Sequence, residues 1–305
     1  MTKEEMYLDI NRWKKEKNAI ILAHYYQCGD IQDIADYVGD SLALAQKAAK
    51  TDASIIVFCG VHFMAETAKL LSPEKKVLLP VMEAGCFMAN MMDEASIKKY
   101  KEENPDTTIL MYVNSTAACK QYADCCVTSS NALSIIDYYS KQGKKMLYGP
   151  DKNLGMYAMK GSNVKLDLWN GFCGIHNGLK VEDVVKAKEE HPNAIFVAHP
   201  ECNLDVLSMA SYVGSTKQLI EYVTKSSDKE FIIGTEEGVI HEMKKKNPDK
   251  EFYLLSKRLR CYEMKLTRLE DLYNCLRDET NEIIIDEEVA SKAVLCVNRM
   301  LELSK

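Results

Sequence analysis

The chain has 305 residues, of which 47% are hydrophobic and 28% are charged, so it can bury a core of the size usual for a globular protein. Its net charge of −6 and isoelectric point of about 5.7 disfavour nucleic acid as a partner, because no basic excess exists to displace phosphate counterions. Residues 1–17 are charged and lack the apolar core of a secretory signal, and no apolar run reaches the roughly 18 residues of a membrane span, so we expect a cytoplasmic protein.

The first part of the chain alternates helical and strand-like segments. A helical pattern at about 3–17 is followed by an apolar, β-branched run at 19–27 that ends sharply at polar residues, as a buried parallel strand does. A helical stretch then follows Ser41, whose hydroxyl is of the type that caps helices. Two more strands are expected at 54–60 and 77–86. Strands that alternate with helices predict βαβ units and a parallel sheet.

The same order of segments returns twice along the chain, with a period of about 87 residues, which indicates an internal repeat. The second and third copies of the first strand are expected at 107–115 and 194–202. Ala35, Ala123 and Ala210 keep the same register downstream of these strands. The other strands of the two later copies are expected at 144–150, 164–173, 230–236 and 252–261.

We therefore predict an α/β fold of three αβα sandwich units with small parallel sheets, related by an approximate three-fold axis around a central site. The units are expected at 1–87, 88–174 and 175–262. The remaining segment, 263–305, is expected to add a helix, a short strand near 282–286 and a final helix, and to pack on one of the units.

Polar residues recur at matched positions of the three copies. The ends of the first strands carry His24 and Tyr26, Tyr112 and Asn114, and His199 and Glu201. The helix starts carry Ser41, Ser129 and Thr216, and the third strands end at Cys86, Cys173 and Cys261. Function collects at the carboxyl ends of parallel strands. Three-fold packing would therefore direct all of these sets into one cavity.

Eleven cysteines are many for a chain of this length, and their odd number without a signal peptide argues against a disulfide framework. No C-x-x-C motif occurs, so a zinc ribbon or a thioredoxin-like site is not expected. Three thiolates at one repeat position suit a soft metal site such as a 4Fe–4S cluster, whose fourth iron would stay open as a Lewis acid. Three packing cysteines at strand ends would explain the same pattern, and the repeat alone leaves this alternative open.

The other matched residues also have two interpretations. The three helix-start hydroxyls predict anion binding, because helix N-termini favour carboxylate and phosphate, although simple capping would use the same residue types. His24 and His199 could be core histidines with a backbone partner. Glu201 is the only carboxylate of its set and is therefore the natural general acid or base.

A series of ordered motifs resembles the quinolinate synthase family. The motifs are AHYYQ with DIADYVGDS, GVHFMAETAKLL, EAGCFMANMM, MYVNSTAACK with ADCCVTSSNA, YGPDKNLG and HPEC, and the resemblance runs from the first strand to the final helix. It implies a transferase of de novo NAD biosynthesis that condenses iminoaspartate with dihydroxyacetone phosphate, loses phosphate and water, and closes the ring of quinolinate. It also implies three pseudo-symmetric α/β sandwiches and a 4Fe–4S cluster on three cysteines.

Carried over residue by residue, the resemblance assigns the cluster to Cys86, Cys173 and Cys261. It implies that the substrate is bound by His24, Ser41, Tyr112, Asn114, Ser129, His199, Glu201 and Thr216, with Tyr26 and His176 close by. Proton transfers would fall mainly on Glu201, with Tyr26, His24 and His199 as the groups that share them. The open iron would bind the substrate or an intermediate and assist its dehydration.

The sequence departs from the family in one place and leaves two other functions open. Some members carry a C-x-x-C-x-x-C run near the third ligand, but here Cys261 is followed by Tyr262, Glu263 and Met264, so a redox switch on such a run is not carried over. An open-iron hydro-lyase and a non-catalytic cluster sensor are the alternatives, and a sensor would need a DNA-binding element or partner surface that the sequence does not indicate. The expected partners are the two small substrates, with a transient contact to the iminoaspartate-producing enzyme left open.

Overall fold

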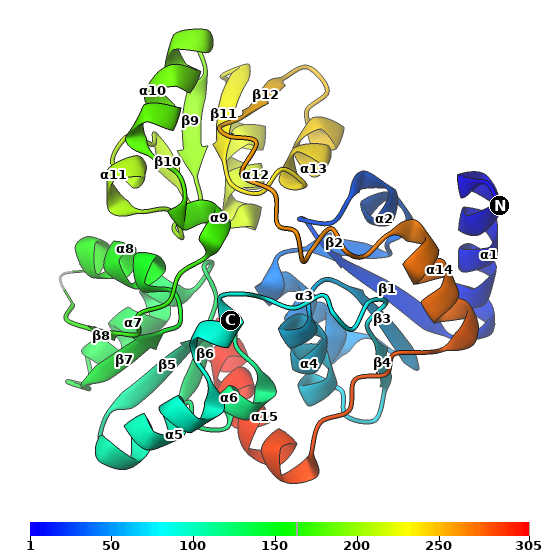
Figure 1. Cartoon of the computed structure of the whole chain (residues 1–305), viewed down its shortest axis with the longest axis horizontal. Coiled ribbons are helices and arrows are strands. Elements are labelled where there is room, and N and C mark those ends of the chain that lie inside the picture. The colour runs from blue at the N-terminus through cyan, green and yellow to red at the C-terminus, as the bar shows by residue number, and fades with distance from the viewer. Residues whose placement is uncertain (163, 305) are drawn as a thin grey trace.

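The computed structural model of the chain describes residues 1–162 and 164–304 and contains three four-stranded sheets, in which all neighbouring strands are parallel. The strands are β1 (Ala19–His24), β2 (Tyr37–Gly39), β3 (Ile55–Cys59), β4 (Lys76–Leu78), β5 (Thr108–Tyr112), β6 (Cys125–Val127), β7 (Met146–Gly149), β8 (Asp167–Leu168), β9 (Ile195–Ala198), β10 (Tyr212–Val213), β11 (Glu230–Gly234) and β12 (Glu251–Leu254). The sheets share one strand order: β2-β1-β3-β4, β6-β5-β7-β8 and β10-β9-β11-β12. The predicted α/β class with three repeated units is confirmed, and Figure 1 shows the units as three lobes around a common centre.

The helices lie on the faces of these sheets and between the units (Figure 1). They are α1 (Lys3–Glu16), α2 (Gly29–Ile34), α3 (Ser41–Lys50), α4 (His62–Leu71), α5 (Glu94–Glu103), α6 (Ala117–Lys120), α7 (Ala132–Ser140), α8 (Lys152–Ser162), α9 (Gly174–Asn177), α10 (Val181–Glu190), α11 (Leu204–Leu207), α12 (Thr216–Lys225), α13 (Val239–Lys246), α14 (Leu269–Asp278) and α15 (Glu287–Leu303). The predicted N-terminal helix corresponds to α1 and is confirmed.

Each unit has one strand more than the sequence predicted. The missed strands β2, β6 and β10 pair with the first strand of their unit at the edge of the sheet. They are two or three residues long, and so short a segment cannot show the alternation on which strand prediction depends.

The first sheet is buried on both faces, as its continuous apolar strands predict. Along β1, Leu22 packs with α3 and α4 residues such as Leu44, while its neighbours Ile21 and Ala23 pack on the opposite face with residues of α1 and α14. Successive side chains of a strand point to opposite faces, so one apolar run supplies two cores. Each fully buried Ile or Leu contributes about 1.5–3 kcal/mol to this packing.

Local signals in the sequence explain where α1 begins and ends. The Thr2 side chain accepts from the backbone N–H of Glu5, and the Glu5 carboxylate accepts from the N–H of Thr2, so the two residues form a capping box. Met6 and Ile10, four residues apart, are the buried residues of the helix. The helix ends before Asn18, which has a left-handed φ of 47° and turns the chain into β1.

The C-terminal segment packs on two units, not on one as predicted. Helix α14 lies against α1 and β3 of the first unit, whereas α15 packs against α6 and β6 of the second unit and also reaches α4 of the first. The prediction of a strand near 282–286 is wrong, because this segment forms only an isolated antiparallel bridge between Leu78 and Glu282. This bridge gives the connection between α14 and α15 a fixed path across the edge of the first sheet.

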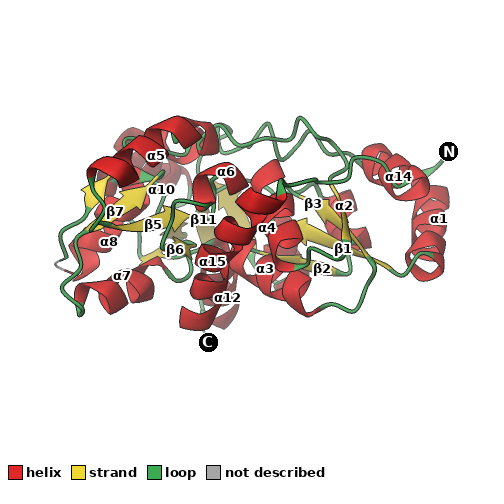
Figure 2. Cartoon of the chain, turned by 90° about the horizontal axis from the view of Figure 1, so that it is seen from below, coloured by secondary structure: helices red, strands yellow, loops and turns green. Residues whose placement is uncertain are grey.

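Figure 2 shows the molecule from the side, wider than it is thick, with α1 and α14 together at one end. No helix within the described part of the chain has both the length and the hydrophobicity needed to cross a bilayer. The unit boundaries 1–87, 88–174 and 175–262 stay a prediction.

Candidate active site

A cavity of about 270 Å³ is lined by residues of all three units. Its wall includes twelve of the thirteen residues predicted for the site: His24, Tyr26, Ser41, Cys86, Tyr112, Asn114, Ser129, Cys173, His199, Glu201, Thr216 and Cys261. The thirteenth, His176, is fully buried and contacts both Cys173 and Glu201. The cavity is of a size that fits a small molecule.

The three candidate cysteines lie on loops that follow the last strand of each unit, which is the third strand expected from the sequence. They do not lie at the strand ends as predicted. The strands β4, β8 and β12 already end at Leu78, Leu168 and Leu254. In the first unit the strand stops before Pro80, which has no N–H to donate to a sheet. These loops extend from the sheet edge to the central cavity, where the three cysteines lie on the wall.

The environment of these cysteines sets them apart from the other eight. Seven of the eleven cysteines are buried, and the partly exposed ones are Cys28, Cys86, Cys173 and Cys261. Cys28 does not line the cavity, whereas the other three do. Burial raises the pKa of the Cys86 thiol to about 11 and also raises the pKa values of Cys173 and Cys261. Three soft sulfur donors around one cavity fit the thiolate ligands that an iron–sulfur cluster requires.

The helix-start hydroxyls lie on the cavity wall, but they are not the helix caps that the sequence predicted. Asp40 caps α3 and Ser215 caps α12, so Ser41 and Thr216 are the first residues inside their helices. In the second unit Ser129 precedes α7, whose N-cap position is Asn131. Because the three hydroxyl groups do not cap their helices, they can contact a ligand near the helix N-termini, where anions are favoured; Thr216 also donates to Tyr26.

Two of the first strands lead into the same local turn, in which a histidine ring accepts a hydrogen bond from the backbone N–H two residues later. The N–H of Tyr26 donates to Nδ1 of His24 at 3.1 Å, and the N–H of Glu201 donates to Nδ1 of His199 at 3.3 Å. Burial, with His199 and Lys265 nearby, lowers the pKa of His24 to about 3, and burial lowers that of His199 to about 4 although Glu201 opposes this. Both rings are therefore neutral near pH 7, and with Nδ1 accepting, each carries its proton on Nε2.

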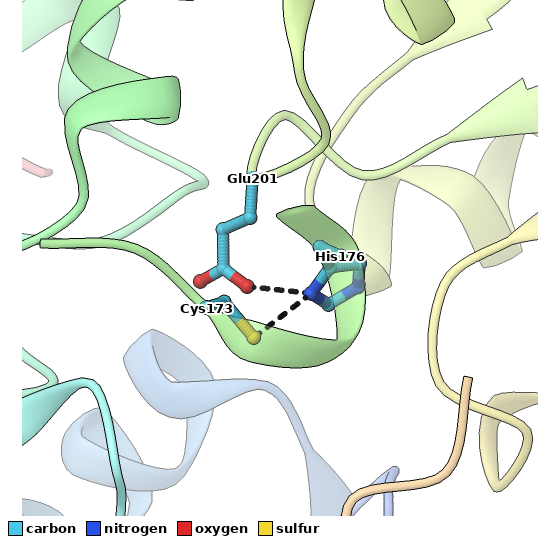
Figure 3. A group of neighbouring side chains, drawn as sticks. All are labelled: Cys173, His176 and Glu201. Carbon is cyan, nitrogen blue, oxygen red and sulfur yellow. Dashed lines mark hydrogen bonds and ion pairs between the residues drawn. The ribbon is translucent and has the colours of Figure 1, made fainter. Parts of the chain in front are cut away.

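Glu201 lies at the centre of a buried hydrogen-bond network (Figure 3). The Tyr112 hydroxyl donates to Oε1 at 2.6 Å, and Nδ1 of His176 lies 2.8 Å from Oε2. Burial alone would raise the pKa of Glu201, but nearby His199 and the hydrogen bonds from His176 and Tyr112 outweigh it and lower this pKa to about 2. The carboxylate is thus held ionised, between residues of the second and third units.

A chain of hydrogen bonds connects Glu201 with Tyr26 across the site. Nε2 of His176 lies 2.9 Å from the Thr235 hydroxyl, which lies 2.7 Å from the Tyr26 hydroxyl. The Thr216 hydroxyl in turn donates to Tyr26 at 3.1 Å. Thr235 was missed by sequence reasoning, although it directly follows β11 and so lies at a strand end like the predicted residues.

The group of side chains in Figure 3 meets the distance requirement for a metal ion: Cys173, His176 and Glu201 offer ligand atoms within 4.8 Å of one another. Both nitrogens of His176 already have close hydrogen-bonding neighbours, which suits a ring that orients Glu201 and Cys173. Arg260 is the only arginine or lysine on the cavity wall among the described residues, and it was also missed. It directly precedes Cys261 and pairs with Glu237 at 2.8 Å.

Comparison with known proteins gives a consistent result over nearly the whole chain. Residues 8–302 match the model of the family described as quinolinate synthetase A protein. The chain is 50% identical to a quinolinate synthase of Alkaliphilus metalliredigens over 99% of its own length and 100% of that protein. It is 48% identical to a quinolinate synthase of Clostridium perfringens (97% and 98% covered) and 45% identical to quinolinate synthase 2 of Methanosarcina acetivorans (97% and 95% covered).

Proposed function

The chain belongs to the quinolinate synthetase A family, and we propose that it condenses iminoaspartate with dihydroxyacetone phosphate in the central cavity, where Cys86, Cys173 and Cys261 hold a 4Fe–4S cluster. As a member of this family it is a quinolinate synthase type of enzyme, which acts on small molecules in NAD biosynthesis. The proposed reaction loses phosphate and water and closes the pyridine ring of quinolinate.

One observation carries the assignment of the cluster. Of the eleven cysteines, the three that share a repeat position are the ones that line the cavity. Packing cysteines would have no reason to converge from three separate loops on one cavity. When bound, a cluster with three protein ligands would supply a Lewis-acidic iron for the loss of hydroxyl groups as water.

The roles of the surrounding residues follow from their chemistry. The ionised Glu201 can accept a proton, and the hydrogen-bond chain through His176 and Thr235 joins it to the Tyr26 hydroxyl. His24 and His199 are neutral and can donate from Nε2. We propose that these groups share the proton transfers of ring closure.

A second set of residues is proposed to bind and orient the substrates. The hydroxyls of Ser41, Ser129 and Thr216 lie near helix N-termini, where the carboxylates and phosphate of the substrates would be stabilised. Tyr112 and Asn114 complete this part of the wall. The transient contact with an iminoaspartate-producing enzyme and the cytoplasmic location stay predictions.

The proposal is tested by anaerobic purification and a direct assay of quinolinate formation, with iron counted per chain. We expect about four irons in the parent chain, and loss of both iron and activity in Cys173→Ala. The matched control is Cys59→Ala, a buried cysteine outside the cavity, which should keep the iron. An intact cluster in Cys173→Ala would refute the ligand assignment. A chain that holds a cluster but forms no quinolinate would instead indicate a hydro-lyase or a sensor.

A further inference from the structure

Two buried carboxylates outside the cavity wall occupy equivalent positions in the second and third units. Asp151 follows β7 by two residues, and Glu236 follows β11 by two residues; both are fully buried. A buried carboxylate is costly unless its oxygens are hydrogen-bonded, so the partners of these two groups indicate what they do.

Both carboxylates bind the backbone N–H of a candidate ligand cysteine. Oδ2 of Asp151 accepts from the N–H of Cys173 at 3.0 Å, and Oε1 of Glu236 accepts from the N–H of Cys261 at 3.1 Å. The other oxygen of each carboxylate accepts from a backbone N–H near the start of the following helix, Leu154 at 2.8 Å and Gly238 at 2.7 Å. Each side chain therefore ties a cysteine loop to a helix start, with one carboxylate oxygen on each N–H.

The backbone around these contacts has the same register in all three units. The N–H of Lys152 donates to the carbonyl of Gly171, and the N–H of Glu237 donates to that of Leu259. In the first unit the equivalent bond runs from His62 to Ala84 at 2.7 Å. The shared bond joins the residue after the carboxylate position to the residue two places before the cysteine, so the three positions can be compared directly.

In the first unit the position of the carboxylate is occupied by Val61, which is buried and lines the cavity. Among the described residues, no carboxylate accepts from the N–H of Cys86. The two carboxylates are therefore not required by the fold of the repeat, because the first unit forms the same turn without one. Glu236 also pairs with the largely buried Lys265 at 3.0 Å. The contacts that both carboxylates share are those to a cysteine loop and to a helix start, so their common role is to be sought at those loops.

We propose that Asp151 and Glu236 are positioning residues that fix the loops of Cys173 and Cys261 for cluster binding, and that Cys86 is the ligand without such a tether. This inference rests on the proposed cluster. Loops carry the cysteines, so their sulfur atoms have no strand to hold them in place, and residues that orient metal ligands typically change metal affinity about 10–100-fold when they are replaced. Each carboxylate also accepts the cysteine N–H, which would otherwise be available to a bound cluster, and hydrogen bonds to cluster sulfurs alter the electronic properties of a cluster.

The test compares the rate at which anaerobically prepared holoenzyme loses iron to an excess of a ferrous chelator. Asp151→Ala and Glu236→Ala are expected to lose iron about 10-fold faster than the parent chain and to give altered electron paramagnetic resonance spectra of the reduced cluster. Asp151→Asn and Glu236→Gln, which keep one acceptor oxygen, should lose iron at intermediate rates. These conservative variants also keep the test decisive if an alanine variant does not fold.

The matched control is Asp124→Ala. Asp124 accepts from the backbone N–H of Ile109 at 2.7 Å in the second unit, so it makes the same kind of contact without touching Cys86, Cys173 or Cys261. It should lose iron at the parental rate. A parental rate and spectrum in a folded Asp151 or Glu236 variant would overturn the inference at that residue while leaving the cluster proposal intact. A parent chain that takes up no cluster would overturn the proposed function and this inference together.

Discussion

Replacing Glu201 by Gln tests the centre of the proposed chemistry with a minimal change in shape. The carboxylate receives two short hydrogen bonds, from Tyr112 at 2.6 Å and from His176 at 2.8 Å. An amide can accept on its oxygen, but its NH₂ group would face the second donor. The variant therefore removes the negative charge and one charge-assisted hydrogen bond together.

The size of the effect distinguishes two roles. A lost hydrogen bond to a charged group costs about 1.5–3 kcal/mol, which corresponds to roughly 10–150-fold if Glu201 only holds its neighbours in place. Loss of a general acid or base lowers the rate by about 10²–10⁴-fold. Because Glu201 is almost fully buried and ionised, we expect the larger loss in kcat, with cluster content unchanged.

The assay is single-turnover and steady-state quinolinate formation under anaerobic conditions, with iron content measured in the same samples. Glu282→Gln is the matched control, since Glu282 pairs with Lys69 at the edge of the first sheet and does not line the cavity. It should retain parental activity. Turnover of Glu201→Gln within about three-fold of the parent would refute the reasoning and move the proton transfers to Tyr26 or the histidines.

Two further predictions concern substrate binding and stability. Ser129→Ala should weaken binding of quinolinate by about 1 kcal/mol in calorimetry without uncapping a helix, since Asn131 holds the N-cap position of α7, and unchanged affinity would contradict the anion site. Hydrogen bonds from Lys76 and Lys17 lower the pKa of Glu279 in the folded protein. At pH values above the unfolded pKa of about 4.3, these ion pairs should stabilise the fold by about 0.2–1 kcal/mol. This stabilisation should disappear as the pH falls through the lower folded pKa. Glu279→Gln should therefore lower the melting temperature at pH 7 but not in strong acid; an equal difference at both pH values would exclude the ion pairs as its cause.

The sequence predicted which residues line the central cavity better than it predicted the elements that carry them. Repeat register alone was enough to expect Cys86, Cys173 and Cys261 at one cavity, because the register is preserved whether the residues lie on strands or on loops. The same register did not reveal that β4 ends at Leu78, since apolar residues continue beyond the strand. Periodicity reports burial, and a buried loop produces the same signal as a buried strand.

Thr235 was missed because its role depends on a contact between units. Thr235 matters because its hydroxyl meets Tyr26 of the first unit and His176 at the start of the third, and no pattern within one repeat predicts that meeting. The capping residues were displaced by one position for a local reason: Asp40 and Ser215 are also good caps and stand directly before the predicted ones. Only the backbone conformation decides which of two adjacent candidates becomes the N-cap.

The three-fold repeat explains how equal positions come to serve unequal tasks. Cysteine occupies the matched position in all three copies, as a symmetric set of sulfur ligands would require. The position two residues after His24, Tyr112 and His199 differs between the units, which have Tyr26, Asn114 and Glu201 there. The proposed condensation would need both a proton donor and a proton acceptor, and three identical copies would offer only one type of group. Repetition therefore accounts for the convergence on one cavity, and the differences between copies supply the distinct groups that the proposed proton transfers would use.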